Sequence, residues 1–254
     1  WGSTSSPKCG TYCEYAVFNQ NEIDLKPENL SFNEAASLPY VALTTWAALI
    51  RWAALRPQDL KNKKVFVQAG SGGVGTFAIQ LLRHWGAKVA TTCSKENHNL
   101  VQELGAEITI DYRKEEFSDL LEGYDLVFDC LGDFGGVDSV TKCLNILKAN
   151  ATSHYISLNH AFIRTIDEKG LLLGLPAALK LRYQVKKSAK PINFHWSLYR
   201  PSSSGLSELG RMVRAEIIKP IIDSVYPLEN IKEAHKKVGT SHARGKVVIE
   251  VKKE

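Results

Sequence analysis

Short apolar runs alternate with stretches of helical periodicity through the middle of the chain. Five runs rich in β-branched and aromatic residues predict buried strands, at 64–68, 87–92, 108–110, 124–130 and 153–158. The segments between them space their apolar residues as helices do, at 76–85, 97–104, 117–121 and 136–147. Strands that alternate with helices need crossover connections, which place parallel strands in one sheet. The pattern therefore predicts the α/β class, with a doubly wound parallel sheet.

The flanks of this region follow another pattern. Residues 10–25 alternate apolar and polar side chains, which is typical of half-buried antiparallel strands. After Leu158 an irregular region precedes helices predicted at 206–215 and 228–238 and strands predicted at 221–225 and 245–251. We expect these flanks to belong to a second domain.

The stretch from Ala35 to Leu55 is the most similar to a membrane span. It is long and apolar, yet it contains Pro39, two threonines and Arg51 and lacks flanking anchors. A helix buried in the core is the favoured interpretation.

Composition and charge narrow the class of protein. With 44% hydrophobic and 23% charged residues, the chain has the composition of a soluble globular protein. A net charge of +5, with both signs interspersed, does not indicate a nucleic-acid partner. An odd number of cysteines, mostly within apolar runs, favours reduced thiols in an intracellular compartment, at Cys9, Cys13, Cys93, Cys130 and Cys143. No secretory signal follows Trp1.

Four glycines, Gly70, Gly72, Gly73 and Gly75, directly follow the first predicted strand and open the first predicted helix. In a dinucleotide-binding turn, one glycine relieves a strained turn, another lets the backbone approach the pyrophosphate, and the last lets the helix pack on the strand. The helix N-terminus then offers N–H groups to the anion, and Ser71 could add a hydroxyl. A packing turn without a ligand is the alternative.

The end of the second strand indicates which nucleotide would bind. An NAD site usually places an acid there, on the ribose hydroxyls. This chain instead has Ser94 and Lys95, which suit a 2′-phosphate, with His98 as a further candidate and no acid before Glu96. The pattern favours NADPH over NADH, and an exposed turn without a ligand is the alternative.

Five linked motifs resemble the zinc-independent quinone oxidoreductase branch of the medium-chain dehydrogenase/reductases. They are SLPYVALTTWAAL at 37–49, AGSGGVG at 69–75, LGAEITIDY at 104–112, DLVFDCLG at 125–132 and HARGKVVI at 242–249. Within that branch the chain is most similar to the mitochondrial group of reticulon-4-interacting proteins, through GTFAIQLL, TTCS, FHWSLY and SHARGK. The resemblance runs from about Gly10 to Val251.

The resemblance implies a Rossmann domain that binds NADPH, beside a catalytic domain built on a GroES-like barrel. The implied division is the end of the GroES-like domain at 1–40, the NADPH-binding domain at 41–200, and at 201–254 a segment that returns to the catalytic domain. The same resemblance assigns the pyrophosphate to Ser71, Gly73, Val74 and Gly75. It assigns the 2′-phosphate to Ser94 and the adenosine end to Tyr112, with Leu158 and Tyr199 beside the nicotinamide and His242, Ala243 and Arg244 reaching back to the cofactor.

A complete member of that branch begins with most of the barrel, whereas this chain begins near its end. The chain is therefore either a fragment or a shortened protein. From the residues alone, Tyr112 could also be a surface residue at a strand end, and Arg244 could be part of a solvated turn.

The sequence gives little sign of metal or nucleophile chemistry. Cys9 and Cys13 are a close pair without further ligands at zinc spacing, and 38–42, where zinc-using relatives place a cysteine, contains none. Cys130 is more typical of core packing. His160, after the fifth strand, could donate a proton to a substrate, although a loop histidine is the simpler interpretation. We expect no metal, and we name no catalytic residue.

The functional expectation is NADPH-dependent transfer of hydride to a quinone or enone, without zinc. The alternative is an NADPH-binding scaffold or sensor without significant turnover. A basic stretch could be a solvated helix face or a peripheral contact with a membrane, at Lys180, Arg182, Lys186, Lys187 and Lys190. The resemblance also implies a mitochondrial location, with the cytoplasm as the alternative, and a homodimer.

Overall fold

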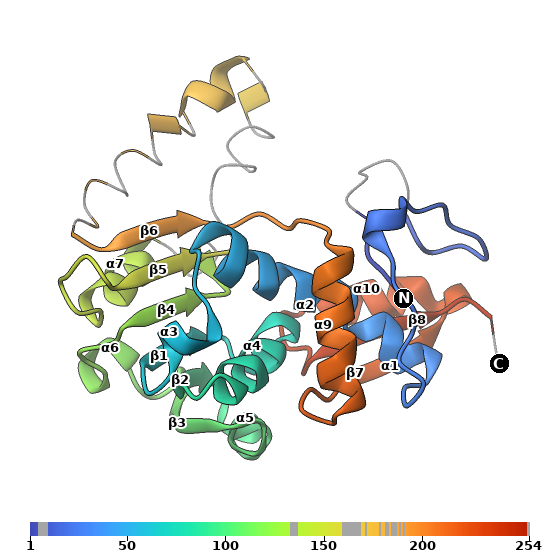
Figure 1. Ribbon diagram of the computed structural model, residues 1–254, viewed down its shortest axis with the longest axis horizontal. Helices are drawn as coiled ribbons and strands as arrows, with labels where there is room; N and C mark the ends of the chain where they lie inside the picture. The colour runs from blue at the N-terminus through green and yellow to red at the C-terminus, as the bar shows by residue number, and fades with distance from the viewer. Residues whose placement is uncertain are drawn as a thin grey trace.

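A six-stranded, entirely parallel sheet forms the centre of the molecule (Figure 1). The computed structural model describes residues 1–4, 10–132, 137–158, 169–170, 172–177, 179–180, 183, 187, 189 and 191–252. The strand order is β3-β2-β1-β4-β5-β6. The strands are β1 (Lys64–Gln68), β2 (Lys88–Cys93), β3 (Ala106–Asp111), β4 (Leu126–Asp129), β5 (His154–Ser157) and β6 (Asn193–Trp196). The order reverses between β1 and β4, and open α/β sheets bind ligands at such a switch point.

Alternate residues of each strand build two separate cores, one on each face of the sheet. Val65, Val67 and Phe128 pack on one face, whereas Phe66 and Val127 pack on the other. The first core is covered by α2 (Pro39–Trp46), α4 (Gly73–His84), α5 (His98–Leu104) and α9 (Ser203–Arg214). The second is covered by α6 (Phe117–Leu120) and α7 (Val137–Asn145). The doubly wound α/β class is therefore confirmed.

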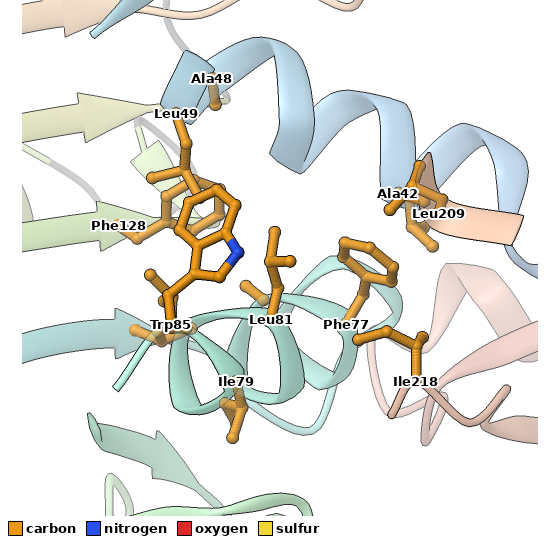
Figure 2. Packing of buried hydrophobic residues seen from close by; sticks show 14 of the residues in the cluster. Ala42, Ala48, Leu49, Phe77, Ile79, Leu81, Trp85, Phe128, Leu209 and Ile218 are labelled. Atoms are coloured by element: carbon orange, nitrogen blue, oxygen red, sulfur yellow. The ribbon is translucent and has the colours of Figure 1, made fainter. Parts of the chain in front are cut away.

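The apolar stretch from Ala35 to Leu55 folds as three consecutive helical pieces. They are α1 (Phe32–Ser37), α2 and a π-helical segment (Ala47–Trp52), and Pro39 occupies the first turn of α2, where its missing N–H costs nothing. Figure 2 shows Phe77 and Leu81 of α4, and Trp85 directly after it, pointing toward this layer. The prediction of a buried helix is confirmed, and no helix among the described residues is long and apolar enough to cross a membrane.

A smaller parallel sheet lies beside the first, on the side of α1, α9 and α10 (Figure 1). Its strands are β7 (Ile222–Pro227) and β8 (Lys246–Glu250), joined through α10 (Ile231–Gly239), and α1 packs against both strands. The remaining short elements are α3 (Pro57–Leu60) and the 3-10 turns η1 (Gln20–Glu22), η3 (Lys95–Asn97) and η5 (Leu228–Asn230). The domain boundaries at 40/41 and 200/201 stay proposals.

The expectation of antiparallel strands at 10–25 is wrong. In the part of the chain that the structure describes, this segment forms only η1 and one isolated bridge, Gly2 to Ile23. Its apolar side chains face solvent, with Tyr15 91% and Val17 87% exposed. Alternation marks a strand only where a neighbouring strand supplies hydrogen bonds and a buried face, and among the described residues the only such pairing here is the short bridge at Ile23.

Sequence analysis also missed β6, because the region after Leu158 was expected to be irregular. Four residues are too few for a reliable period, and only Phe194 and Trp196 of β6 point into the second core. Tertiary pairing with β5 defines this strand rather than a local pattern.

Candidate functional site

The glycine turn connects the end of β1 to the start of α4 at the switch point of the sheet. Its backbone is tied to β2, because the Gly70 N–H donates to Thr92 O at 2.9 Å and the Ala69 N–H donates to the Thr92 hydroxyl at 3.1 Å. Ala69 has a left-handed φ of +59°, whereas the four glycines of the turn do not. The expectation that a glycine relieves the strained position of the turn is therefore wrong.

Gly70 and Gly75 serve close packing. A Cβ on Gly70 would lie 2.0 Å from the Thr91 hydroxyl, and one on Gly75 would lie 2.4 Å from Ala69 O. These contacts are far shorter than van der Waals distances, so both positions require glycine for the helix to sit on the strands. The packing-turn interpretation explains these two glycines without any ligand.

Gly72 is different, because packing does not require it to be glycine. A Cβ there would meet nothing within 4 Å except Ala69 O at 3.4 Å. Directly after it, Gly73, Val74 and Gly75 form the first turn of the twelve-residue helix α4. Open space beside a helix N-terminus suits a phosphate group, since N–H groups and the positive end of the helix dipole point at it. The residues present fit the pyrophosphate of a dinucleotide.

The segment 242–246 docks on the glycine turn from the far end of the chain. Gly245 forms a parallel bridge to Gly72, and its N–H donates to Ser71 O at 2.9 Å. Gly245 has φ +83°, and a Cβ there would lie 2.2 Å from Ile221 O. Gly245 thus ties the end of the segment that contains His242, Ala243 and Arg244 to the turn that holds Ser71. Their contact with a nucleotide stays a prediction.

Asp223 of β7 fixes this docking segment. Its carboxylate accepts the Arg244 N–H at 2.8 Å and lies 3.3 Å from Lys237 Nζ. Burial opposes the charge of Asp223, but the Arg244 N–H, the Ser224 hydroxyl and Lys237 together hold its pKa below the usual range. Asp223 was not predicted as a site residue, because an acid within a short strand does not by itself indicate a functional role.

Ser94 lies directly beyond β2, beside the glycine turn in the sheet order, and is 7% exposed. Its hydroxyl accepts from Asn97 Nδ2 at 3.1 Å. Lys95 opens η3 and is exposed, whereas His98 contacts the Thr109 hydroxyl through Nδ1 at 3.2 Å. The Nε2 atom of His98 is buried without a hydrogen-bond partner among the described residues. At this predicted 2′-phosphate site Ser94 is therefore buried, whereas Lys95 is exposed.

Tyr112 follows β3, the strand beside β2, and is 53% exposed. The guanidinium of Arg113 lies 5.8 Å from the centre of its ring and 3.1 Å from Glu96. Arg113 was missed in the sequence, where only its neighbour Tyr112 was considered. Its adjacency to the IDY triplet was the available signal.

Leu158 follows β5 and is half-buried, and its N–H donates to Asp129 O at 3.1 Å. The side chain of Asp129, fully buried at the end of β4, accepts the N–H groups of Leu131 and Gly132 and the Tyr155 hydroxyl at 2.6 Å. Asp129 therefore holds the loop after β4 at the carboxyl edge of the sheet. An acid ending an apolar strand, in DLVFDC, was the signal for it.

Tyr199 lies beyond β6 and stacks on Tyr40 of α2, with ring centres 5.0 Å apart. Its hydroxyl donates to Ser3 O at 2.7 Å, and burial, the largest cause, raises its pKa. Tyr40 is 53% exposed, and the next residue, Val41, packs near Gly73. Tyr40 was missed as a site residue, although it stands in the LPY triplet of the first motif. The stacked pair lies at the carboxyl end of the sheet, on the side of β6 and Leu158.

The other candidates from the sequence give a mixed picture. Cys130 is half-buried, and desolvation followed by Asp129 raises the pKa of its thiol, which suits packing rather than chemistry. Cys13 is exposed. Among the described residues, no group of three or more histidines, cysteines or acids could hold a metal ion. Cys9 and His160 lie outside the described residues, as do Arg182, Lys186 and Lys190 of the basic stretch.

Comparison with known proteins agrees with this geometry. A family model for zinc-binding dehydrogenases matches residues 104–249. The mitochondrial NAD(P)H oxidoreductase RTN4IP1 of Danio rerio is 35% identical over 99% of this chain and 65% of its own length. The human protein of the same name is 34% identical over 99% of this chain and 64% of its own length. The chain thus spans just under two thirds of these relatives.

A solved structure supports the same assignment. The quinone oxidoreductase from Coxiella burnetii is 30% identical, with a TM-score of 0.72 over 92% of this chain and 65% of its own. An NAD-dependent alcohol dehydrogenase is 26% identical, with a TM-score of 0.74 over 96% of this chain and 66% of its own. The mitochondrial expectation agrees with the names of the RTN4IP1 relatives. Together with the family model and the glycine turn, these similarities show that the chain belongs to the zinc-binding dehydrogenase family of the medium-chain dehydrogenase/reductases.

Proposed function

We propose that the protein is a mitochondrial, NADPH-dependent oxidoreductase that reduces a conjugated carbonyl, a quinone or an enone, without zinc. One observation carries this proposal. The open space beside the Gly72 Cα lies between the N-terminus of α4 and the docked segment 242–246, at the switch point of a Rossmann sheet. That is where such folds bind dinucleotides.

Each predicted contact has a physical reason in this arrangement. The first turn of α4, with Gly73, Val74 and Gly75, would bind the pyrophosphate through N–H groups, assisted by Ser71. Ser94 would hold the 2′-phosphate, and Tyr112 the adenosine end. His242, Ala243 and Arg244 would close over the cofactor from the docked segment.

The nicotinamide half would lie on the other side of the turn, toward β5 and β6. When bound, the nicotinamide supplies a hydride to the acceptor. The half-buried Leu158 and Tyr199 would form an apolar wall that orients the ring and excludes water. Asp129, through the loop it holds, would keep this wall in place.

The partly exposed ring of Tyr40, stacked on Tyr199, offers a flat aromatic surface beside that position. A planar acceptor such as a quinone can stack on such a ring. This feature favours quinones and enones over aliphatic carbonyls. A homodimer and a peripheral contact with a membrane through the basic stretch remain proposals.

Nucleotide titration tests the cofactor site. We expect the 254-residue chain to bind NADPH at least about tenfold more tightly than NADH, because a 2′-phosphate adds charge-assisted hydrogen bonds. Ser94→Asp should abolish that preference, since a carboxylate would repel the phosphate. Ser207→Asp, an exposed serine on α9, is the matched control and should change nothing. Absence of binding by either nucleotide would refute the proposal.

Turnover then separates an enzyme from a scaffold. NADPH oxidation with a simple quinone should be steady and should fall in Tyr40→Leu, because that change removes the aromatic surface. Tight NADPH binding without oxidation across several quinones and enones would favour the alternative, an NADPH-binding scaffold or sensor.

A further inference from the structure

Glu96 forms an ion pair with Arg113 close in sequence to Ser94, the residue proposed to hold the 2′-phosphate of NADPH. The proposed phosphate ligand Ser94 is two residues before it, and Arg113 binds its carboxylate with Nη1 3.1 Å from Oε1 and 3.4 Å from Oε2. The Glu96 backbone N–H and the Ser94 hydroxyl, followed by Arg113, lower the pKa of Glu96, so both side chains act on the same carboxylate. One acid therefore occupies the guanidinium that a phosphate would need, two residues from Ser94.

The Glu96–Arg113 pair can open at little cost. The side chains of Glu96 and Arg113 are 70% and 45% exposed, and exposed ion pairs contribute little to stability. Neither residue is part of a strand or a helical core: Glu96 lies in η3, and Arg113 follows Tyr112 in the turn after β3. Exchange of Glu96 for another anion would thus leave the fold unchanged.

Arg113 is also held over the ring of Tyr112, which keeps its guanidinium at the adenosine end of the sheet. A guanidinium matches the geometry of a phosphate through two parallel N–H bonds and remains charged at any physiological pH. Lys95, on the opposite side of Glu96 in sequence, is exposed and forms no ion pair among the described residues. Arg113 is therefore the positively charged side chain whose position the structure fixes at this site.

We propose that Arg113 and Glu96 together form the NADPH selector of this protein: the 2′-phosphate displaces the Glu96 carboxylate from Arg113 and binds the freed guanidinium, next to Ser94. This inference rests on the proposed NADPH site. NADH lacks that phosphate and leaves the Glu96–Arg113 pair closed. Arg113 thus discriminates between the two nucleotides, while Glu96 competes with the phosphate and lowers the affinity for NADPH.

The test is titration of the 254-residue chain and its variants with four probes: NADPH, NADH, 2′,5′-ADP and 5′-AMP. Arg113→Gln should weaken NADPH and 2′,5′-ADP by about tenfold or more and change NADH and 5′-AMP by less than about twofold. Glu96→Gln should strengthen NADPH and 2′,5′-ADP by about threefold or more. The controls with the same change of charge are the exposed Lys114→Gln and Glu103→Gln, which should shift all probes equally and slightly.

Three results would overturn the inference, and they differ from failure of the proposed function. Equal losses of NADPH affinity in Arg113→Gln and Lys114→Gln would show that the effect comes from the net charge of the chain and not from Arg113 itself. Unchanged or weaker NADPH binding in Glu96→Gln would show that the Glu96 carboxylate does not compete with the 2′-phosphate for Arg113. Parallel losses of NADPH and NADH in Arg113→Gln would make Arg113 a general adenosine contact. If the unmodified chain binds none of the four probes, the nucleotide site itself is refuted, and the selector with it.

Discussion

Ala69 adopts the left-handed backbone conformation at the last position before four glycines, where a side chain is unfavourable. The cost is tolerated because the residue is tied on both sides: its N–H bonds to Thr92, and its carbonyl accepts the Gly72 N–H at 3.2 Å. Strained backbone of this kind persists where surrounding contacts over-determine it. At residue scale, the turn is thus a rigid frame in which close packing requires Gly70 and Gly75 to be small.

Two alanine substitutions in the turn should have opposite consequences. Gly70→Ala should destabilise the fold by about 1–3 kcal/mol, because the new Cβ would clash with Thr91. Gly72→Ala should leave the free energy of unfolding nearly unchanged but weaken NADPH binding, since the methyl group would fill the space left for the phosphate. Urea denaturation and NADPH titration of both variants check this. Equal nucleotide binding by Gly72→Ala and the unmodified chain would show that no phosphate approaches Gly72.

The buried contact between Tyr155 and Asp129 offers a second test. Tyr155→Phe removes one hydrogen bond to a fully buried carboxylate and should cost about 1.5–3 kcal/mol in the free energy of unfolding. Tyr183→Phe, at an exposed tyrosine, is the control and should be neutral. A loss below about 0.5 kcal/mol in Tyr155→Phe would mean that Asp129 is satisfied without this hydroxyl.

At the scale of elements, the sequence predicted β1 to β5 and the helices between them because each carries a long apolar run or a clear helical period. It failed at residues 10–25 and at β6, where pairing with another strand, or its absence, decides the outcome. The same limit applies to the site. The glycine turn has a local signature, whereas Arg113, Asp129 and Asp223 gain their roles from partners distant in sequence.

The edge of the main sheet should respond to acid. His154 of β5 and His195 of β6 lie side by side, with Nδ1 and Nε2 3.1 Å apart, and burial lowers the pKa of His154 despite the opposing field of Asp59. The folded state therefore favours neutral His154. Its contribution to stability is full above the ordinary histidine pKa of about 6.5 and is lost as the pH falls below it.

We expect acidification from about pH 7.5 to about pH 5.5 to lower the free energy of unfolding by about 0.5 kcal/mol through this pair, after allowance for solvent screening. His154→Gln should flatten that part of the pH dependence, whereas His84→Gln, at the exposed end of α4, should retain it. Urea denaturation at both pH values measures the difference. If the free energy of unfolding of His154→Gln depends on pH as steeply as that of the unmodified chain, other groups cause the acid sensitivity.

At the scale of the whole molecule, the two sheets are joined at the glycine turn. The bridge from Gly72 to Gly245 connects the turn between β1 and α4 of the large sheet to the segment before β8, and the bond from Arg244 to Asp223 ties that segment to β7. Core packing also crosses this junction, since Leu209 and Ile218 belong to the same cluster as Phe77 and Leu81 (Figure 2). The proposed nucleotide site would therefore depend on both sheets.

Loosening that junction should weaken the site without unfolding either sheet. Asp223→Asn removes the charge that holds the Arg244 N–H and Lys237, so NADPH affinity should fall by about three- to tenfold. Hydrogen exchange at 240–246 should accelerate while exchange in β1 and β4 stays slow. Asp119→Asn, at an exposed acid on α6, is the control. Unaltered exchange at 240–246 would show that Asp223 does not fix the segment.

The bridge between Gly72 and Gly245 also sets an order of events on the ribosome. Strand β1 and the turn emerge early and can begin to pack as the chain is synthesised, but the residues that dock on the turn emerge much later. A chain released before residue 245 would carry the glycine motif yet lack the segment 242–246 that docks on it. Capture of the nucleotide would thus report that translation has proceeded past this residue, and incomplete chains would remain without the stabilisation that a bound cofactor gives.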